Sequence, residues 1–191
     1  MKRMLVIGIG SLVMRDDGIG ARAVEAIGSR LREHDVASFV GETDFQSCFD
    51  EIRPDDFVII VDAMLRGAEP GRIDVTPLDE ALKDRGRLRA QHEFSLFDLM
   101  ELHAPETQGC FIGIETAEIG FGFELSEPLN SRFEQICNDV SNAVLEAVFT
   151  SENMIKLVYE KRNEAETGVP GRPDRQAMGG DKPAVFGIAR I

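Results

Sequence analysis

The chain has 191 residues, 43% of them hydrophobic, which suffices for one globular domain with a substantial core. Its formal net charge of −13 argues against binding to nucleic acids or anionic membranes, which calls for a basic face. The three cysteines form no Cys-x-x-Cys pair, so we expect free thiols in a reducing compartment. No apolar stretch is long enough to span a bilayer, and we expect a cytoplasmic protein.

Strand and helix patterns alternate along the first 150 residues. Short apolar runs predict strands at 5–9, 36–40, 57–61, 72–76 and 109–114. Apolar residues at helical spacing predict helices at 20–31, 45–52, 78–82, 96–102 and 126–148. The run 57–61 is continuously apolar, as expected for a central strand covered on both faces. This alternation predicts an α/β fold with a doubly wound sheet.

The chain changes character near residue 150. Apolar residues at 154–159 can continue a helix, whereas 164–182 is rich in charge, glycine and proline and has no apolar period. We therefore expect two parts, an α/β domain at 1–150 and a helical extension with a flexible tail at 151–191.

The stretch between the first strand and the first helix carries the most distinctive motif. It contains the adjacent carboxylates Asp16 and Asp17 among several glycines, and it follows the carboxyl end of a strand. Ligands bind at that edge of open α/β sheets. A dinucleotide fingerprint, Gly-x-Gly-x-x-Gly, fits poorly, because Val13 replaces the third glycine and acids lie where a pyrophosphate would bind. The motif instead favours a cation site or acid–base chemistry.

Another carboxylate, Asp62, directly follows the 57–61 strand. It either caps the next turn or serves as a ligand or catalytic group. If the first strand lies between the second and the third, the loops after strands one and three diverge at the switch point of the sheet. Asp62 and either Asp16 or Asp17 would then meet there. Together with a histidine they would suit a divalent metal such as zinc or nickel.

Two histidines compete for the third position. His92 precedes the helix expected at 96–102, and His103 follows it. We favour His92 because it lies nearer the predicted active edge. Other hydrolytic sites are disfavoured, since no Gly-x-Ser-x-Gly elbow occurs and the cysteines fall inside helices or strands.

These motifs together resemble those of the hydrogenase maturation proteases, peptidases that trim the carboxyl terminus of the [NiFe]-hydrogenase large subunit. The matching elements are Gly8-x-Gly10-Ser11 with Asp16-Asp17-Gly18-x-Gly20, Val61-Asp62-Ala63, the isolated His92, and Phe121-Gly122 with Leu125-Ser126. The resemblance covers about 1–148. It implies a three-layer α/β/α sandwich around a twisted, mostly parallel central sheet.

The resemblance also implies a site and an activity. One divalent ion would be held by Asp17, Asp62 and His92, which would be both metal ligands and catalytic residues, with Asp16 supporting them. The expected metal is Ni²⁺ supplied by the substrate, a [NiFe]-hydrogenase large-subunit precursor. The implied enzyme is an endopeptidase of the aspartic or metal-dependent type, which removes the precursor's carboxyl-terminal extension during hydrogenase maturation.

Two loops depart from the family pattern. Gly41-Glu42-Thr43 replaces a glycine pair, and Glu115-Thr116 stands where a proline often follows the strand, so substrate choice within the family stays open. The alternative function is a non-catalytic, nickel-dependent assembly factor on the same fold, which would bind the same ion and partner without cutting. Only a cleavage assay separates the two.

Overall fold

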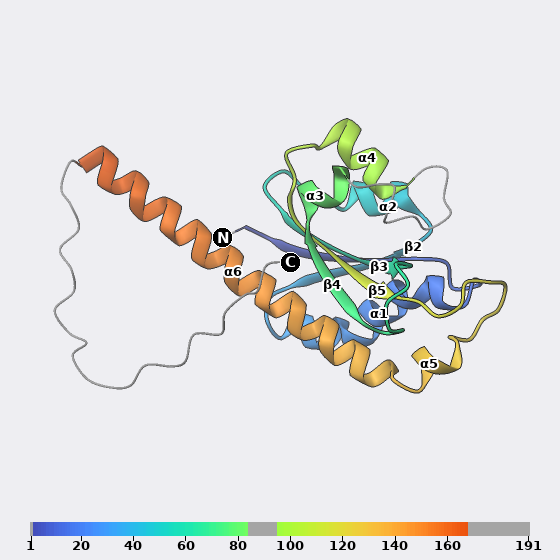
Figure 1. Ribbon diagram of the computed structural model, residues 1–191. Coiled ribbons are helices and arrows are strands. Elements are labelled where there is room, and N and C mark those ends of the chain that lie inside the picture. The colour runs from blue at the N-terminus through green and yellow to red at the C-terminus, as the bar shows by residue number, and fades with distance from the viewer. Residues whose placement is uncertain (1, 84–94, 168–191) are drawn as a thin grey trace, which may run out of the picture. The chain divides into compact units, whose positions relative to one another are not determined.

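The computed structural model describes residues 2–83 and 95–167, with side chains described up to Thr150 (Figure 1). It divides into two compact units, Met1–Ser151 and Glu152–Ile191. The last helix, α6 (Phe133–Thr167), extends past the point where the sequence predicts a tail, and residues 168–191 lie outside the described part. Among the described residues, no helix has both the length and the apolar character needed to cross a bilayer.

The first unit is built on one five-stranded sheet with the strand order β2-β1-β3-β5-β4. Its strands are β1 (Met4–Ile9), β2 (Ala37–Glu42), β3 (Phe57–Met64), β4 (Ile73–Pro77) and β5 (Gln108–Glu115). All neighbours pair in parallel except β4, which is antiparallel to β5 at one edge. The first strand thus lies between the second and the third, which is the arrangement on which the expected switch point depends.

Helices cover both faces of this sheet. They are the 3-10 helix η1 (Asp16–Gly18) and the α-helices α1 (Ile19–Arg32), α2 (Phe45–Asp50), α3 (Leu78–Lys83), α4 (Leu96–His103), α5 (Glu127–Asn130) and α6. Figure 1 shows α1 and the first part of α6, up to residue 151, against one face and α2, α3 and α4 against the other. The fold is the predicted α/β/α sandwich.

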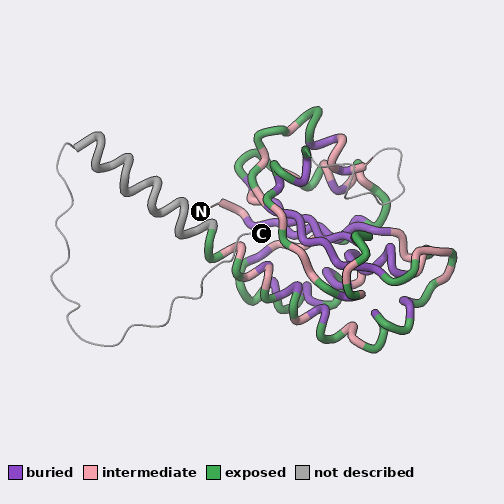
Figure 2. The backbone as a smooth tube through the Cα atoms, in the orientation of Figure 1, coloured by how far each residue is buried: buried purple, intermediate pink, exposed green. Residues whose placement is uncertain are grey.

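Two hydrophobic clusters hold these layers together, because successive strand residues point to opposite faces. On one face Val6, Ile59 and Ile112 pack with α1 and α6. On the other face Leu5, Ile60 and Phe111 pack with α2, α3 and α4. The central strands are therefore buried on both sides, as Figure 2 shows, which explains their continuous apolar runs.

The third strand differs from its prediction in a way that shapes the site. We expected it to end at Val61, but β3 continues to Met64 because Asp62, Ala63 and Met64 still pair with β5. Its pairing with β1 ends earlier, at Gly8 and Val61. Asp62 therefore lies within β3, just past the last residue that pairs with β1.

Candidate functional site

The site lies where β1 and β3 separate at the carboxyl edge of the sheet. From the carboxyl end of β1 the chain runs to β2 on one side, whereas from the carboxyl end of β3 it runs to β4 on the other side, so the two connections diverge here. Such a switch point forms the ligand crevice of open α/β sheets. Asp17 reaches it from η1, and Asp62 reaches it from β3.

Asp62 is the more perturbed of the two carboxyls. Its side chain is buried, with the residue 6% exposed, and its Oδ1 accepts a hydrogen bond of 2.7 Å from the Ala63 N–H. Burial raises the pKa of Asp62 to about 8, the Ala63 hydrogen bond opposes this rise, and the charge of Asp17 adds to it. The two carboxyls are thus close enough to repel each other, which a bound cation would relieve.

Asp17 is held by the fold of its own loop. It is 4% exposed, and its Oδ2 accepts a hydrogen bond of 2.8 Å from the Ser11 N–H. The loop turns back at Gly10, whose φ is 120° and whose missing Cβ would lie 1.9 Å from the Asp17 carbonyl oxygen. At Gly20 a Cβ would lie 2.4 Å from the Val61 carbonyl oxygen, so glycine there lets α1 begin directly against β3.

Asp16 has a different role from that of its neighbour. It is fully buried, and its carboxylate accepts hydrogen bonds from the Ala117 N–H (3.0 Å), the Glu118 N–H (2.8 Å), and the Ser126 N–H and hydroxyl (2.7 Å each). Both oxygens are therefore used to fasten η1 to the segment 116–126. This arrangement agrees with the supporting role predicted for Asp16.

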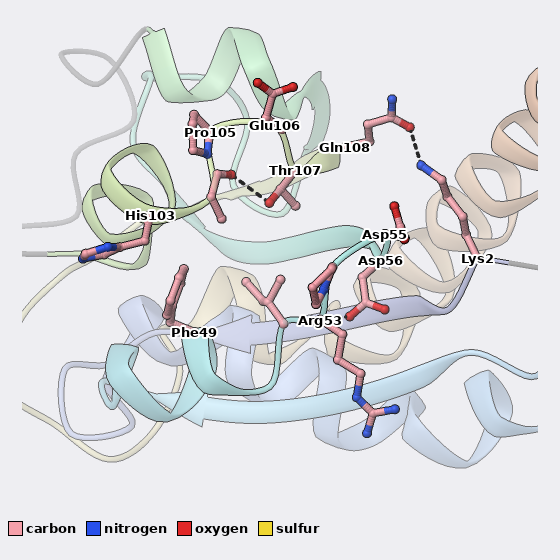
Figure 3. A pocket seen from close by; sticks show the side chains of 13 residues that line it. Lys2, Phe49, Arg53, Asp55, Asp56, His103, Pro105, Glu106, Thr107 and Gln108 are labelled. Atoms are coloured by element: carbon pink, nitrogen blue, oxygen red, sulfur yellow. Dashed lines mark hydrogen bonds between the residues drawn. The ribbon is translucent and has the colours of Figure 1, made fainter.

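The structure places one of the two candidate histidines. His92 lies outside the described residues, so its place in the site stays a prediction. His103 ends α4 and lines a cavity of about 630 Å³ with Lys2, Asp56 and Gln108, which precede or begin β1, β3 and β5 (Figure 3). That cavity lies at the amino edge of the parallel strands, opposite Asp17 and Asp62. His103 is therefore not their partner; its ring packs 5.9 Å from that of Phe49.

A metal would find two protein ligands in the described part of the chain. Within residues 2–83 and 95–150, no cluster of three or more histidine, cysteine or acidic side chains could hold an ion. Asp17 and Asp62 supply carboxylate oxygens, which fit a divalent cation, and a third ligand would have to come from His92 or from the substrate.

The cysteines do not form a nucleophilic site. Cys48, Cys110 and Cys137 are all buried. Desolvation raises the pKa of Cys48 to about 12 and the pKa values of Cys110 and Cys137 to about 11. Since the thiolate is the reactive form, these thiols are inert, as the sequence predicted.

Comparisons with known proteins show the family to which the chain belongs. The family model described as "Hydrogenase maturation protease" matches residues 21–143. The chain belongs to this family. Among its relatives are the hydrogenase expression/formation proteins HupM of Azotobacter chroococcum mcd 1 and HoxM of Azotobacter vinelandii, each 30% identical. These matches cover 69% of this chain and 66% and 67% of the relatives, so the chain spans about two thirds of their length.

Solved structures of the family show the same fold. The [NiFe] hydrogenase maturation protease HybD from Thermococcus kodakarensis has a TM-score of 0.57 and 26% identity, covering 74% of this chain and 99% of that one. The hydrogenase maturating endopeptidase HybD from E. coli has a TM-score of 0.62, with 21% identity and coverage of 75% and 93%. The latter supports the fold alone.

One buried acid at this edge has a role that sequence reasoning missed. Glu115, the last residue of β5, is fully buried, and its carboxylate accepts hydrogen bonds from the Arg66, Gly67 and Ala68 N–H groups at 2.7 to 3.1 Å. It fixes the turn between β3 and β4 beside the site. An acid directly after a buried apolar run was the available signal, as it was for Asp62.

The raised pKa of Asp62 predicts how stability depends on pH. Between the ordinary carboxyl pKa and about 8, the folded state keeps a proton that the unfolded state releases, so stability falls as pH rises. Asp62→Asn removes this loss. In metal-free buffer we expect the free energy of unfolding of the variant, relative to that of the wild type, to increase by roughly 2 kcal/mol as the pH rises from 5 to 7. Urea unfolding at both pH values measures it, and parallel pH profiles would contradict the assignment.

Proposed function

We propose that this protein is an endopeptidase that removes the carboxyl-terminal extension of a nickel-bearing [NiFe]-hydrogenase large-subunit precursor. Family membership supports this activity. The observation that carries it is the meeting of Asp17 and Asp62 at the switch point, buried and electrostatically coupled. Such a pair is costly unless a cation or a proton offsets it, and the precursor's nickel would be that cation. The reaction would take place in the cytoplasm.

The precursor's nickel is part of the substrate in this proposal. Cysteines of the precursor hold the ion. The coordination positions that these cysteines leave open are taken by Asp17, Asp62 and His92. When bound, nickel can polarise the scissile carbonyl and acidify a water molecule. The chain's own contribution is to orient the scissile bond: η1 and β3 hold the two carboxylates rigidly, so the precursor is bound in one position. In this proposal the enzyme is of the aspartic or metal-dependent type.

The two histidines provide a matched test. We expect His92→Ala to lower the kcat/KM for precursor cleavage by about 100-fold or more, because a ligand of the shared ion is lost. His103→Ala should stay within about twofold of the wild type, because His103 lies at the opposite edge of the sheet. Gel mobility of the precursor after timed incubation reports both.

The outcomes separate the proposed function from its alternative. Normal cleavage by His92→Ala would show that His92 is not part of the site, but the protein would still be assigned as a protease. A wild-type protein that binds the precursor and never shortens it would be a nickel-dependent assembly factor.

A further inference from the structure

Two loops at the carboxyl edge are joined into one rigid unit. The Arg15 N–H donates to the Gly122 carbonyl at 3.0 Å, and the Gly122 N–H donates to the Val13 carbonyl at 3.0 Å. This pairing joins the loop that carries Asp17 to the segment 116–126, which Asp16 fastens a second time. The segment is therefore held directly beside the proposed site.

Arg22 of α1 forms hydrogen bonds to the same two loops. Its Nη2 donates to the Phe123 carbonyl at 2.6 Å and to the Leu12 carbonyl at 3.3 Å. At the far end of the segment, Leu125 is buried in the core. The backbone of 116–126 is thus ordered before any partner arrives, so little conformational entropy would be lost on binding.

This rigid segment nevertheless exposes aromatic side chains. Phe121 is 77% exposed and Phe123 is 62% exposed, and their rings lie 5.8 Å apart in an edge-to-face arrangement. Val13, on the paired loop, is 43% exposed. These side chains do little for the core, and adjacent exposed aromatics on an ordered backbone are typical of the centre of a protein-binding site.

The charges around these residues indicate the kind of partner. Glu118 and Glu124 are exposed on the same segment, and Glu127 is exposed directly after it. Of the two nearby arginines, Arg15 pairs with Glu118 at 3.4 Å and Arg22 donates to backbone carbonyls. The chain as a whole has a net charge of −13. This surface therefore complements a segment in which apolar and basic side chains are neighbours.

We propose that Val13, Phe121 and Phe123 form a docking surface for a segment of the large-subunit precursor that carries an apolar side chain beside a basic one, close to the scissile bond. The inference rests on the proposed function. The docking surface adjoins the site because one loop carries both Val13 and Asp17, so a peptide held there would run past the two carboxylates.

The double variant Phe121→Ser/Phe123→Ser tests the docking surface. We expect its KM for the precursor to rise about 30-fold while kcat changes less than about threefold, because aromatic anchors act in binding and not in the chemical step. Binding by the wild type should also weaken as salt concentration rises. The matched control is Leu102→Ser, which removes a side chain 71% exposed in the last turn of α4; its KM should not change.

Further readouts keep the result unambiguous. Phe121→Leu/Phe123→Leu should restore most of the affinity, and thermal melting should show that all variants fold. If the wild type cuts the precursor and the serine variant shows an unchanged KM, the docking surface is wrong while the proposed function stands. If instead the serine variant only converts a dimer to a monomer in gel filtration, the surface joins two copies of this chain, and the inference is overturned. If the wild type does not cut at all, the proposed function itself fails.

Discussion

Asp17→Asn and Asp62→Asn should each reduce cleavage of the nickel-bearing precursor by about 10³-fold or more, equivalent to about 4 kcal/mol of transition-state stabilisation. Asparagine keeps the shape of the side chain but not its charge. The site would therefore keep its geometry and lose most of its affinity for a divalent ion. Single-turnover cleavage at saturating enzyme measures the effect without interference from product release.

The same variants carry an internal control. Asp62→Asn should be more stable than the wild type near neutral pH, since the buried carboxyl with a pKa of about 8 is gone. If a variant is stable but inactive, the substitution has removed catalytic activity without unfolding the protein. Near-normal cleavage by either variant would remove that carboxylate from the proposed site.

Asp16→Ala should destabilise the protein by about 4 kcal/mol, the largest stability effect we expect from a single substitution. The change leaves three backbone N–H groups, of which that of Ser126 is buried and the other two are partly buried, and the Ser126 hydroxyl without their acceptor. It also removes the side-chain attachment between η1 and the segment 116–126. Urea unfolding gives the free energy directly.

The comparison for Asp16 is an acid that is exposed. Asp79→Ala breaks the pair with Lys83, whose side chains are 68% and 76% exposed, and should cost less than about 0.5 kcal/mol. If Asp16→Ala lost no more stability than Asp79→Ala, the buried network would not be holding the two loops together.

The sheet could be predicted because its central strands are buried on both faces and therefore read as continuous apolar runs. The end of β3 could not, because Asp62 interrupts the apolar run while the backbone goes on pairing with β5. Ser126 shows the same limit. Its position before Glu127 and Pro128 correctly predicts a helix start, but that helix is the short α5, and the helix predicted to run on to residue 148 begins anew as α6 at Phe133. The Ser126 hydroxyl donates to Asp16, 110 positions away, and makes no capping bond to α5. Local patterns do not report such distant partners.

For the site, the sequence predicts which two loops lie together. Alternating strands and helices place the loops after β1 and β3 together, which brings in Asp62 and one of two adjacent acids. Residue type alone could not distinguish Asp16 from Asp17, and only the hydrogen-bond partners of Asp16 identify it as the anchor. The exclusion of His103 likewise needed its position at the amino edge, whereas His92 remains a prediction.

Intact-mass measurement of the large-subunit precursor tests nickel-dependent processing most directly. Nickel-loaded and nickel-free samples of the same precursor are incubated with the wild-type protein and with Asp62→Asn. We expect the mass to fall by that of a carboxyl-terminal peptide only where nickel and the wild-type protein are both present. An unchanged mass in that sample would contradict the endopeptidase assignment, and equal loss with and without nickel would contradict nickel as the recognised feature.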